Sequence, residues 1–155
     1  MSEVGPWTNE DFDAMSWHDA YVYGFRLESF DDEKGSADLV LDIDYILKWV
    51  KTDDSYLFSV CQAVLRFHEV FGLRFLLDYA TPTAGTCPFR LNDIERERLE
   101  FPNGYTSYRW RLPFAWPHGE IEFEAPRFTQ SLVGTPQLQD SQCLPPDKRR
   151  REYAA

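Results

Sequence analysis

The tetrapeptide Ser16-Trp17-His18-Asp19 places a histidine beside an acidic residue, between a short predicted helix and the first predicted strand. A histidine titrates near neutral pH and can ligate a metal, so the pair could carry chemistry. Neighbouring residues of a strand point to opposite faces, however, so the two side chains need not work together. We expect a structural junction, with Trp17 in the core and Asp19 bonded to backbone, and retain Trp17, His18 and Asp19 as candidate binding residues.

Asp42 and Asp44 form the second candidate group. Alternate residues of a strand share a face, about 7 Å apart. Carboxylates at this spacing can divide acid and base roles, or hold a hard cation. Two aspartates on the solvent face of a half-buried strand are also ordinary surface residues. We expect both to be exposed, so that replacing them by asparagine slows association with a partner and leaves the fold intact.

No other pattern in the sequence supports catalysis. His68 and His118 stand apart, without the spacing of H-x-H or H-E-x-x-H metal sites. The sequence also lacks a G-x-S-x-G nucleophile motif and a glycine-rich phosphate loop. Cys61 falls within a predicted strand, where a small core residue is its usual role. We therefore predict no catalytic residue, no metal and no cofactor.

Residues 38–49 (DLVLDIDYILKW) provide the clearest structural signal, because their apolar side chains recur at every second position. Such a period predicts a half-buried strand. Residues 21–27 alternate in the same way, and the polar stretch 31–36 (DDEKGS) between them predicts a hairpin. The side chains expected on the core face of the longer strand, with Tyr45 and Trp49 as core residues, are Leu39, Leu41, Ile43, Tyr45, Leu47 and Trp49.

Further strands are expected at 57–68, 73–79, 106–114, 120–125 and 127–133. Imperfect alternation in 57–68 indicates either a bulge near 62–64 or burial on both faces, and we expect a turn at 68–72. Residues 91–100 fit a strand slightly better than a helical stripe. In the second predicted hairpin, two arginines share a side with three glutamates, so cross-strand ion pairs are expected: these residues are Arg109, Arg111, Glu120, Glu122 and Glu124.

These patterns predict a mostly β protein, either an antiparallel sandwich or a curved, barrel-like sheet of about eight strands. Thr8 can cap a short N-terminal helix over residues 8–15. The sequence lacks the long intervening helices that a parallel sheet needs. We expect a single domain over residues 1–133. Residues 134–155 have few apolar side chains, and we expect an extended or disordered tail.

The chain carries a formal net charge of −10. Residues 147–152 (DKRRRE) hold four basic and two acidic side chains, which leaves −12 for residues 1–146. Such a field repels nucleic acids and anionic lipid surfaces, and it favours a basic protein as a partner. Three separated cysteines without a C-x-x-C pair indicate a reducing compartment. With no secretion signal and no apolar run long enough to span a membrane, we expect a cytoplasmic protein.

Three segments resemble a group of small bacterial β-rich proteins of unknown function: Trp17-His18-Asp19 (W-H-D), residues 41–46 (LDIDYI) with Trp49, and residues 63–70 (AVLRFHEV). More loosely, the chain is similar to the β-rich immunity proteins of polymorphic toxin systems. The resemblance covers about residues 16–133. It implies that the protein binds and blocks a toxin domain, and it carries over no catalytic residue.

We therefore expect a non-enzymatic cytosolic binding protein, such as an immunity-type inhibitor of a basic toxin. One alternative is a small enzyme or ligand-binding barrel that uses His18, Asp19, Asp42 and Asp44. Another is a homodimer that pairs through a strand edge and has only a structural role. A neighbouring toxin gene would support the first hypothesis, and a closed polar pocket around His18 would support the second.

Overall fold

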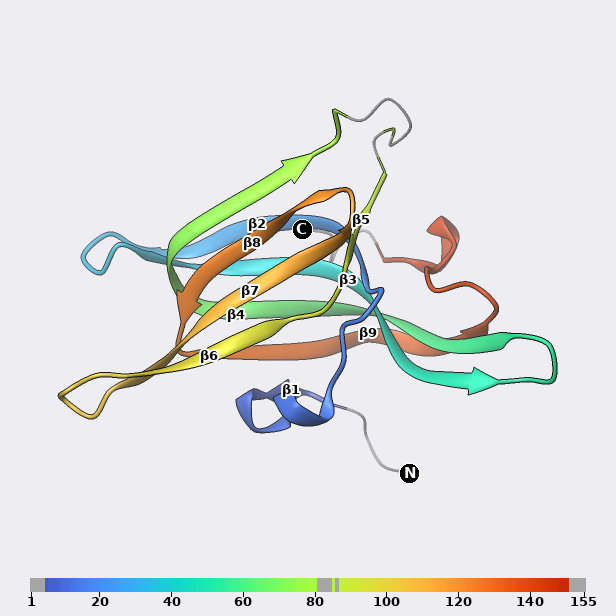
Figure 1. Ribbon diagram of the computed structural model, residues 1–155, viewed down its shortest axis with the longest axis horizontal. Helices are drawn as coiled ribbons and strands as arrows, with labels where there is room; N and C mark the ends of the chain where they lie inside the picture. The colour runs from blue at the N-terminus through green and yellow to red at the C-terminus, as the bar shows by residue number, and fades with distance from the viewer. Residues whose placement is uncertain (1–4, 81–84, 86, 151–155) are drawn as a thin grey trace.

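The computed structural model describes residues 5–80, 85 and 87–150. These residues form nine strands in a single antiparallel sheet, with little helix, which confirms the predicted fold class (Figure 1). The main strand order is β1-β9-β4-β3-β2-β5-β7-β6, and β8 lies between β4 and β7. The strands are β1 Trp7–Thr8, β2 Tyr21–Asp31, β3 Ser36–Lys51, β4 Tyr56–Asp78, β5 Phe89–Leu91, β6 Glu95–Glu100, β7 Thr106–Trp116, β8 His118–Ala125 and β9 Arg127–Gln139.

The sheet folds back on itself through the long strand β4. The first half of β4 pairs with β3 and β9, and the second half pairs with β8. The predicted turn at 68–72 is wrong, because the strand bends there and continues. Glu69 and Gly72 both have positive φ angles, of 55° and 65°, and the pairing register shifts beside each of them. Such bulges bend a strand without ending it.

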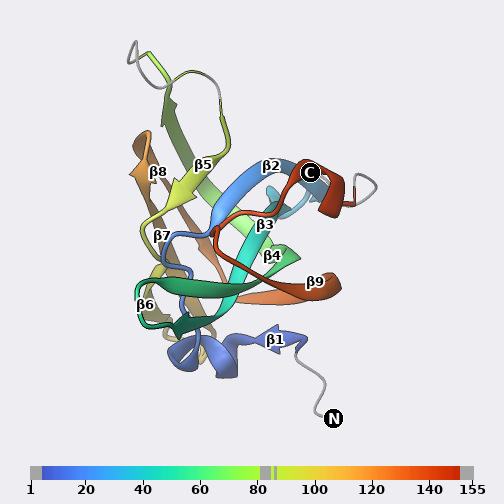
Figure 2. The ribbon, with the colours of Figure 1, turned by 90° about the vertical axis from the view of Figure 1, so that its right-hand side faces the viewer.

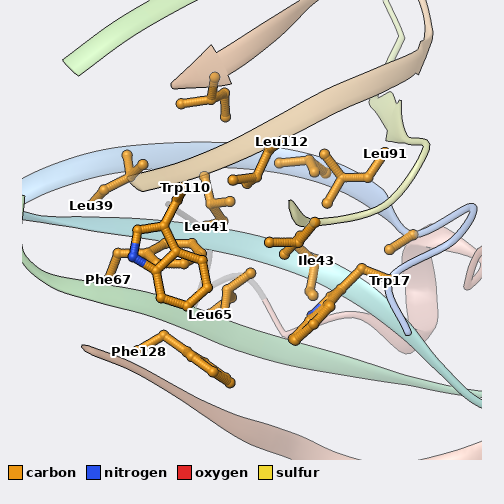
Figure 3. Close-up of a cluster of buried hydrophobic side chains, with 14 of the residues drawn as sticks. Trp17, Leu39, Leu41, Ile43, Leu65, Phe67, Leu91, Trp110, Leu112 and Phe128 are labelled. Atoms are coloured by element: carbon orange, nitrogen blue, oxygen red, sulfur yellow. The ribbon is translucent and has the colours of Figure 1, made fainter. Parts of the chain in front are cut away.

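One hydrophobic core lies between the two halves of the sheet (Figure 3). Trp17 and Tyr45 are buried in it, as predicted. The indole N–H of Trp17 donates to the Oε1 atom of Gln130 at 2.7 Å, which satisfies its one polar atom. β3 and β4 provide one side of the core, and β7 and β8 provide the other; the largest contributors include Leu41, Leu65, Phe67, Trp110, Leu112 and Ile121.

Trp49 is not a core residue, and that prediction is wrong. Its exposed fraction is 43%. The pairing of β3 with β4 shifts by one residue between Ile46 and Lys48, so that Leu47 is an extra residue in β3. A shift of one residue turns all the following side chains to the other face of the sheet. Trp49 therefore lies on the outer face, which is the face of the sheet turned away from this core. There it packs against Phe58.

The structure also tests the predictions for the two hairpins, for residues 91–100 and for the first half of β4. The hairpin of β2 and β3 is confirmed, and residues 91–100 contain strands rather than a helix. In the first half of β4, Gln62 and Ala63 are both buried, so that burial on both faces explains its pattern. The predicted ion pairs of the second hairpin are present; one of them joins Arg109 to Glu124 at 3.1 Å.

The N-terminal helix is a 3₁₀ helix over Asn9–Ala14, slightly shorter than predicted. The backbone N–H of Thr8 donates to the Asp11 carboxylate at 2.8 Å, which fixes the start of the helix. Phe12 then packs against the core. In the described part of the chain, no helix is long and apolar enough to cross a membrane.

The predicted domain boundary at residue 133 needs correction. Strand β9 continues to Gln139, and residues 140–150 fold back across the outer face of the sheet alongside β2 and β3 (Figure 2). Leu144 is buried there against Ile46, Phe58 and Val60. We call residues 140–150 the C-terminal segment. Residues 151–155 of the predicted tail lie outside the described residues.

Candidate functional site

Asp42 and Asp44 are buried, although the sequence suggested that they face solvent. Their exposed fractions are 2% and 0%. Both lie on the outer face of β3, as the alternation indicates, but the C-terminal segment covers that face. The cover comes from residues about a hundred positions away in the sequence, so that the pattern of β3 alone contains no sign of it.

Arg149 brings its guanidinium group between the two carboxylates. Nη2 contacts Oδ1 of Asp42 and Nη1 contacts Oδ1 of Asp44. The same group lies over the Tyr23 ring, 3.6 Å from its centroid. Tyr23 is the extra residue at a register shift in β2, between Val22 and Gly24. Two carboxylates and an aromatic face are the surroundings in which arginine binds best.

The other polar atoms around this cluster are also paired. The backbone N–H of Leu144 donates to Oδ2 of Asp44 at 2.8 Å. Gln62 donates to Oδ1 of Asp42 at 3.0 Å, and its Oε1 atom accepts the backbone N–H of Arg150 at 2.7 Å. With both oxygens of Asp44 and Oδ1 of Asp42 engaged, the aspartates attach the C-terminal segment and are not an open acid and base pair.

Tyr23 remains a neutral phenol beside Arg149. Burial, together with the nearby Cys143 thiol, raises the pKa of Tyr23 to about 12. The ring therefore offers its face to the cation over the whole physiological pH range. No group of three or more His, Cys, Asp or Glu side chains within the described ranges is arranged to hold a metal ion.

His18 and Asp19 do come together, contrary to the expectation for strand neighbours. Asp19 has a φ angle of 64° and lies in a turn before β2, so that the alternation of a strand does not apply. The Nε2 atom of His18 lies 3.6 Å from Oδ2 of Asp19. Nδ1 of His18 donates to the carbonyl oxygen of Asn92 at 2.8 Å, which leaves Nε2 facing the carboxylate.

The Asp19 carboxylate bonds side chains, whereas the sequence suggested a bond to backbone. The Nε2 atom of Gln142 donates to it at 3.0 Å, and Nε of Arg90 lies 3.5 Å away. Because Gln142 and Arg149 both belong to the C-terminal segment, this segment joins the two candidate groups that the sequence identified. Asp19 and the buried pair Asp42 and Asp44 are thus attached to the same stretch of chain.

Three aromatic rings remain exposed beside this closed cluster, and we call them the aromatic patch: His18, Trp49 and Tyr56. The His18 and Trp49 rings are stacked, with centroids 6.2 Å apart and planes at 24°. Tyr56 meets Trp49 edge-on at 6.2 Å. The sequence pattern gives no sign of the patch, because the period of two assigns Trp49 to the core and gives Tyr56 no role.

A second polar network lies on the outer face nearer the start of β3. Arg66 donates to the Asp38 carboxylate at 2.7 Å, and that carboxylate also accepts the backbone N–H of Glu69 at 3.0 Å. His68 bonds Thr129 on β9 at 2.9 Å. Burial lowers the pKa of His68, and the nearby Arg127 guanidinium lowers it further.

The His68 environment predicts a loss of stability in mild acid. The unfolded chain binds a proton at His68 near pH 6.5, whereas the folded chain resists it, so the free energy of unfolding decreases as the pH falls below about 6.5. Urea unfolding at pH 7.5, 6.5 and 5.5 measures the slope of the free energy of unfolding against pH. His68→Asn is expected to flatten it, while His118→Asn, a change at an exposed histidine, leaves it unchanged. Equal slopes in all three proteins would contradict the assignment to His68.

Comparisons of this chain with protein-family models, with curated proteins and with solved structures found no match.

Proposed function

We propose that this chain is a non-enzymatic binding protein that recognises a basic protein through the aromatic patch. The observation that carries the proposal is the exposure of Trp49 and Tyr56 in contact with each other and near His18. Tryptophan and tyrosine are the residues that most often dominate the energy of protein interfaces. Their planar rings bury a large area with little loss of conformational freedom.

The charge of the chain supports a basic partner. Residues 1–146 carry −12, and Arg149 neutralises part of that charge only locally, at Asp42 and Asp44. Exposed acids remain on the surface near the patch, including Asp53 and Asp54 in the β3–β4 turn. An acidic body accelerates the approach of a basic protein, and contacts at the patch then hold it.

An immunity-type inhibitor is the cellular role that we propose for such a protein. A toxin that acts on nucleic acid is commonly basic because it must attract phosphates, and an acidic protein binds the same surface. The proposed role needs a rigid surface and no reacting group. The alternative of a small enzyme at His18, Asp19, Asp42 and Asp44 has less support, because both buried aspartates already bond the C-terminal segment through Arg149 or Leu144.

Replacement of Trp49 and Tyr56 by alanine tests the proposal. Because both rings are half exposed, each change is expected to cost about 1 kcal/mol of stability, the typical value for a point substitution. Loss of interface residues of this type weakens partner binding by about 2 kcal/mol or more, which is roughly thirtyfold. The measurement is affinity capture from the native host, followed by mass spectrometry and titration of the recovered protein.

The matched control is the double variant Phe101→Ala and Tyr105→Ala. These two rings are also exposed and in contact, with centroids 5.7 Å apart, but they lie at the β6–β7 turn. We expect the control to capture the basic partner as well as the unchanged protein does. The proposal is wrong if no basic protein is recovered, or if the patch variant retains the same affinity as the control.

A further inference from the structure

The C-terminal segment lies across the outer face of the sheet without joining it (Figure 2). The last strand of the described chain, β9, ends at Gln139, so residues 140–150 pair with no strand. Their backbone bonds side chains instead, including those of Asp44 and Gln62, and Leu144 is the one buried residue among them. A segment held in this way can open locally while the strands below it stay paired.

The surface below this segment contains a site for one arginine side chain. Asp42 and Asp44 on β3 bond the two Nη atoms of Arg149, whose side chain is only 8% exposed. The ring of Tyr23 on β2 lies against the same guanidinium group. A lysine ammonium is a compact charge that cannot match two carboxylates and a ring as a planar guanidinium does, so the site selects arginine. Because its lining residues belong to paired strands, the site remains when the segment leaves.

Arg149 satisfies this site only in part. Two formally charged carboxylates face one guanidinium group, which leaves one negative charge in excess. Among the described residues, Oδ2 of Asp42 has no hydrogen-bond partner, although the residue is only 2% exposed. This oxygen is available to a further N–H donor, which the attached segment does not supply. A ligand that supplies it makes one charge-assisted bond more than Arg149 does.

An apolar slot lies beside the arginine site. Leu144 fills the slot, and its backbone N–H bonds Asp44, which fixes the slot next to the two carboxylates. Leu144 and Arg149 are five positions apart, and the four residues between them are exposed. We call the arginine site and the slot together the covered surface. It fits an apolar side chain followed five residues later by an arginine. The slot is formed by side chains of β3 and β4: Ile46, Phe58 and Val60.

We propose that the covered surface binds an arginine-containing segment of a basic protein, and that the C-terminal segment is an internal occupant which this ligand displaces. Charge favours such a partner, because residues 1–146 carry −12. A second copy of the chain would bring the same excess of acid. The covered surface shares no residue with the aromatic patch, so the proposal does not rest on the proposed function.

The test uses the full chain, its Arg149→Ala variant and two synthetic ten-residue peptides of serine and lysine with one leucine. The fifth residue after the leucine is arginine in the first peptide and lysine in the second, so that both carry the same charge. Calorimetric titration measures affinity. We expect Arg149→Ala to bind the arginine peptide at least about tenfold more tightly than the unchanged chain does, because an attached segment competes at an effective concentration of about 1 mM. The variant prefers the arginine peptide to the lysine peptide by about tenfold or more.

Hydrogen exchange in the unchanged chain measures displacement directly, and it requires no variant to fold. An excess of the arginine peptide is expected to accelerate exchange at the backbone amides of Leu144 and Arg150, which bond Asp44 and Gln62 when the segment is attached. The lysine peptide at the same concentration leaves both amides protected.

Two further variants, both made in the Arg149→Ala background, separate the arginine site from general charge attraction. Asp44→Asn is expected to weaken binding of the arginine peptide about tenfold or more. Glu97→Gln removes the same charge at an exposed position on β6 and changes affinity less than about twofold.

Three results would overturn the proposal: equal binding of the two peptides, equal affinities of the Asp44 and Glu97 variants, or unchanged exchange at Leu144 and Arg150. Light scattering adds a fourth. A dimer of the unchanged chain that the arginine peptide dissociates would assign the covered surface to the C-terminal segment of a second copy, and the proposal would be wrong.

Discussion

Replacing Trp110 by alanine is expected to lower the free energy of unfolding by about 3 to 5 kcal/mol. Trp110 is fully buried on β7, between the two halves of the sheet. Its ring packs against Phe67 with centroids 5.0 Å apart and against Phe128 at 5.7 Å. Its indole N–H donates to the carbonyl oxygen of Ala125 at 2.9 Å. Alanine would leave a cavity and an unpaired buried acceptor.

Urea unfolding of the Trp110 variant is the measurement, with Trp116→Ala as the matched control. Trp116 is on the same strand, and its exposed fraction is 42%. We expect a change of about 1 kcal/mol for the control. Trp110→Phe retains most of the buried volume and keeps the measurement possible if the alanine variant does not fold. A midpoint for Trp110→Ala that matches the control would show that the two halves of the sheet do not share this core.

Replacing Arg149 by alanine is expected to release the C-terminal segment. Removal of one partner from a buried ion pair costs about 3 to 5 kcal/mol when the remaining charge stays buried. Here Asp42 and Asp44 would both be left without their cation, so that detachment of the segment and entry of water become the lower-energy outcome. Detachment costs only the free energy that holds the segment on the sheet. We therefore expect the free energy of unfolding to fall by at most about 3 to 5 kcal/mol.

Hydrogen exchange measures the release at two backbone amides, those of Leu144 and Arg150, which donate to Asp44 and Gln62. Protection at both is expected to disappear in the Arg149 variant. Arg150→Ala is the matched control, because Arg150 contacts Gln62 through backbone atoms that alanine retains. Unchanged protection in Arg149→Ala, or equal loss in the two variants, would mean that the guanidinium group does not hold the segment.

The local patterns of the sequence were sufficient to predict the antiparallel hairpins, since hydrophobic alternation depends on near neighbours. The errors arose where one extra residue or a distant segment changes the outcome. The bulge at Leu47 moves Trp49 to the outer face, and alternation alone contains no sign of it. A turn was predicted at 68–72, where Gly72 is a residue typical of turns, yet β4 only bends there.

The candidate site was predicted only in part, because a distant segment of the chain completes it. Trp17 is in the core, and the shared face of Asp42 and Asp44 is correct. Their burial depends on Arg149, whose basic stretch has the composition of a solvated tail. Substitution of the two aspartates by asparagine is consequently a test of segment attachment, and the partner is expected to meet the aromatic patch instead.

Association kinetics with the captured partner test the central claim most directly, namely that an acidic body attracts a basic protein onto the aromatic patch. We predict that raising the salt concentration from about 20 to 500 mM lowers the association rate constant of the unchanged protein by tenfold or more. Trp49→Ala should leave that rate constant within about twofold and raise the dissociation rate constant by tenfold or more. An association rate that is insensitive to salt, together with an unchanged dissociation rate in Trp49→Ala, would contradict the account.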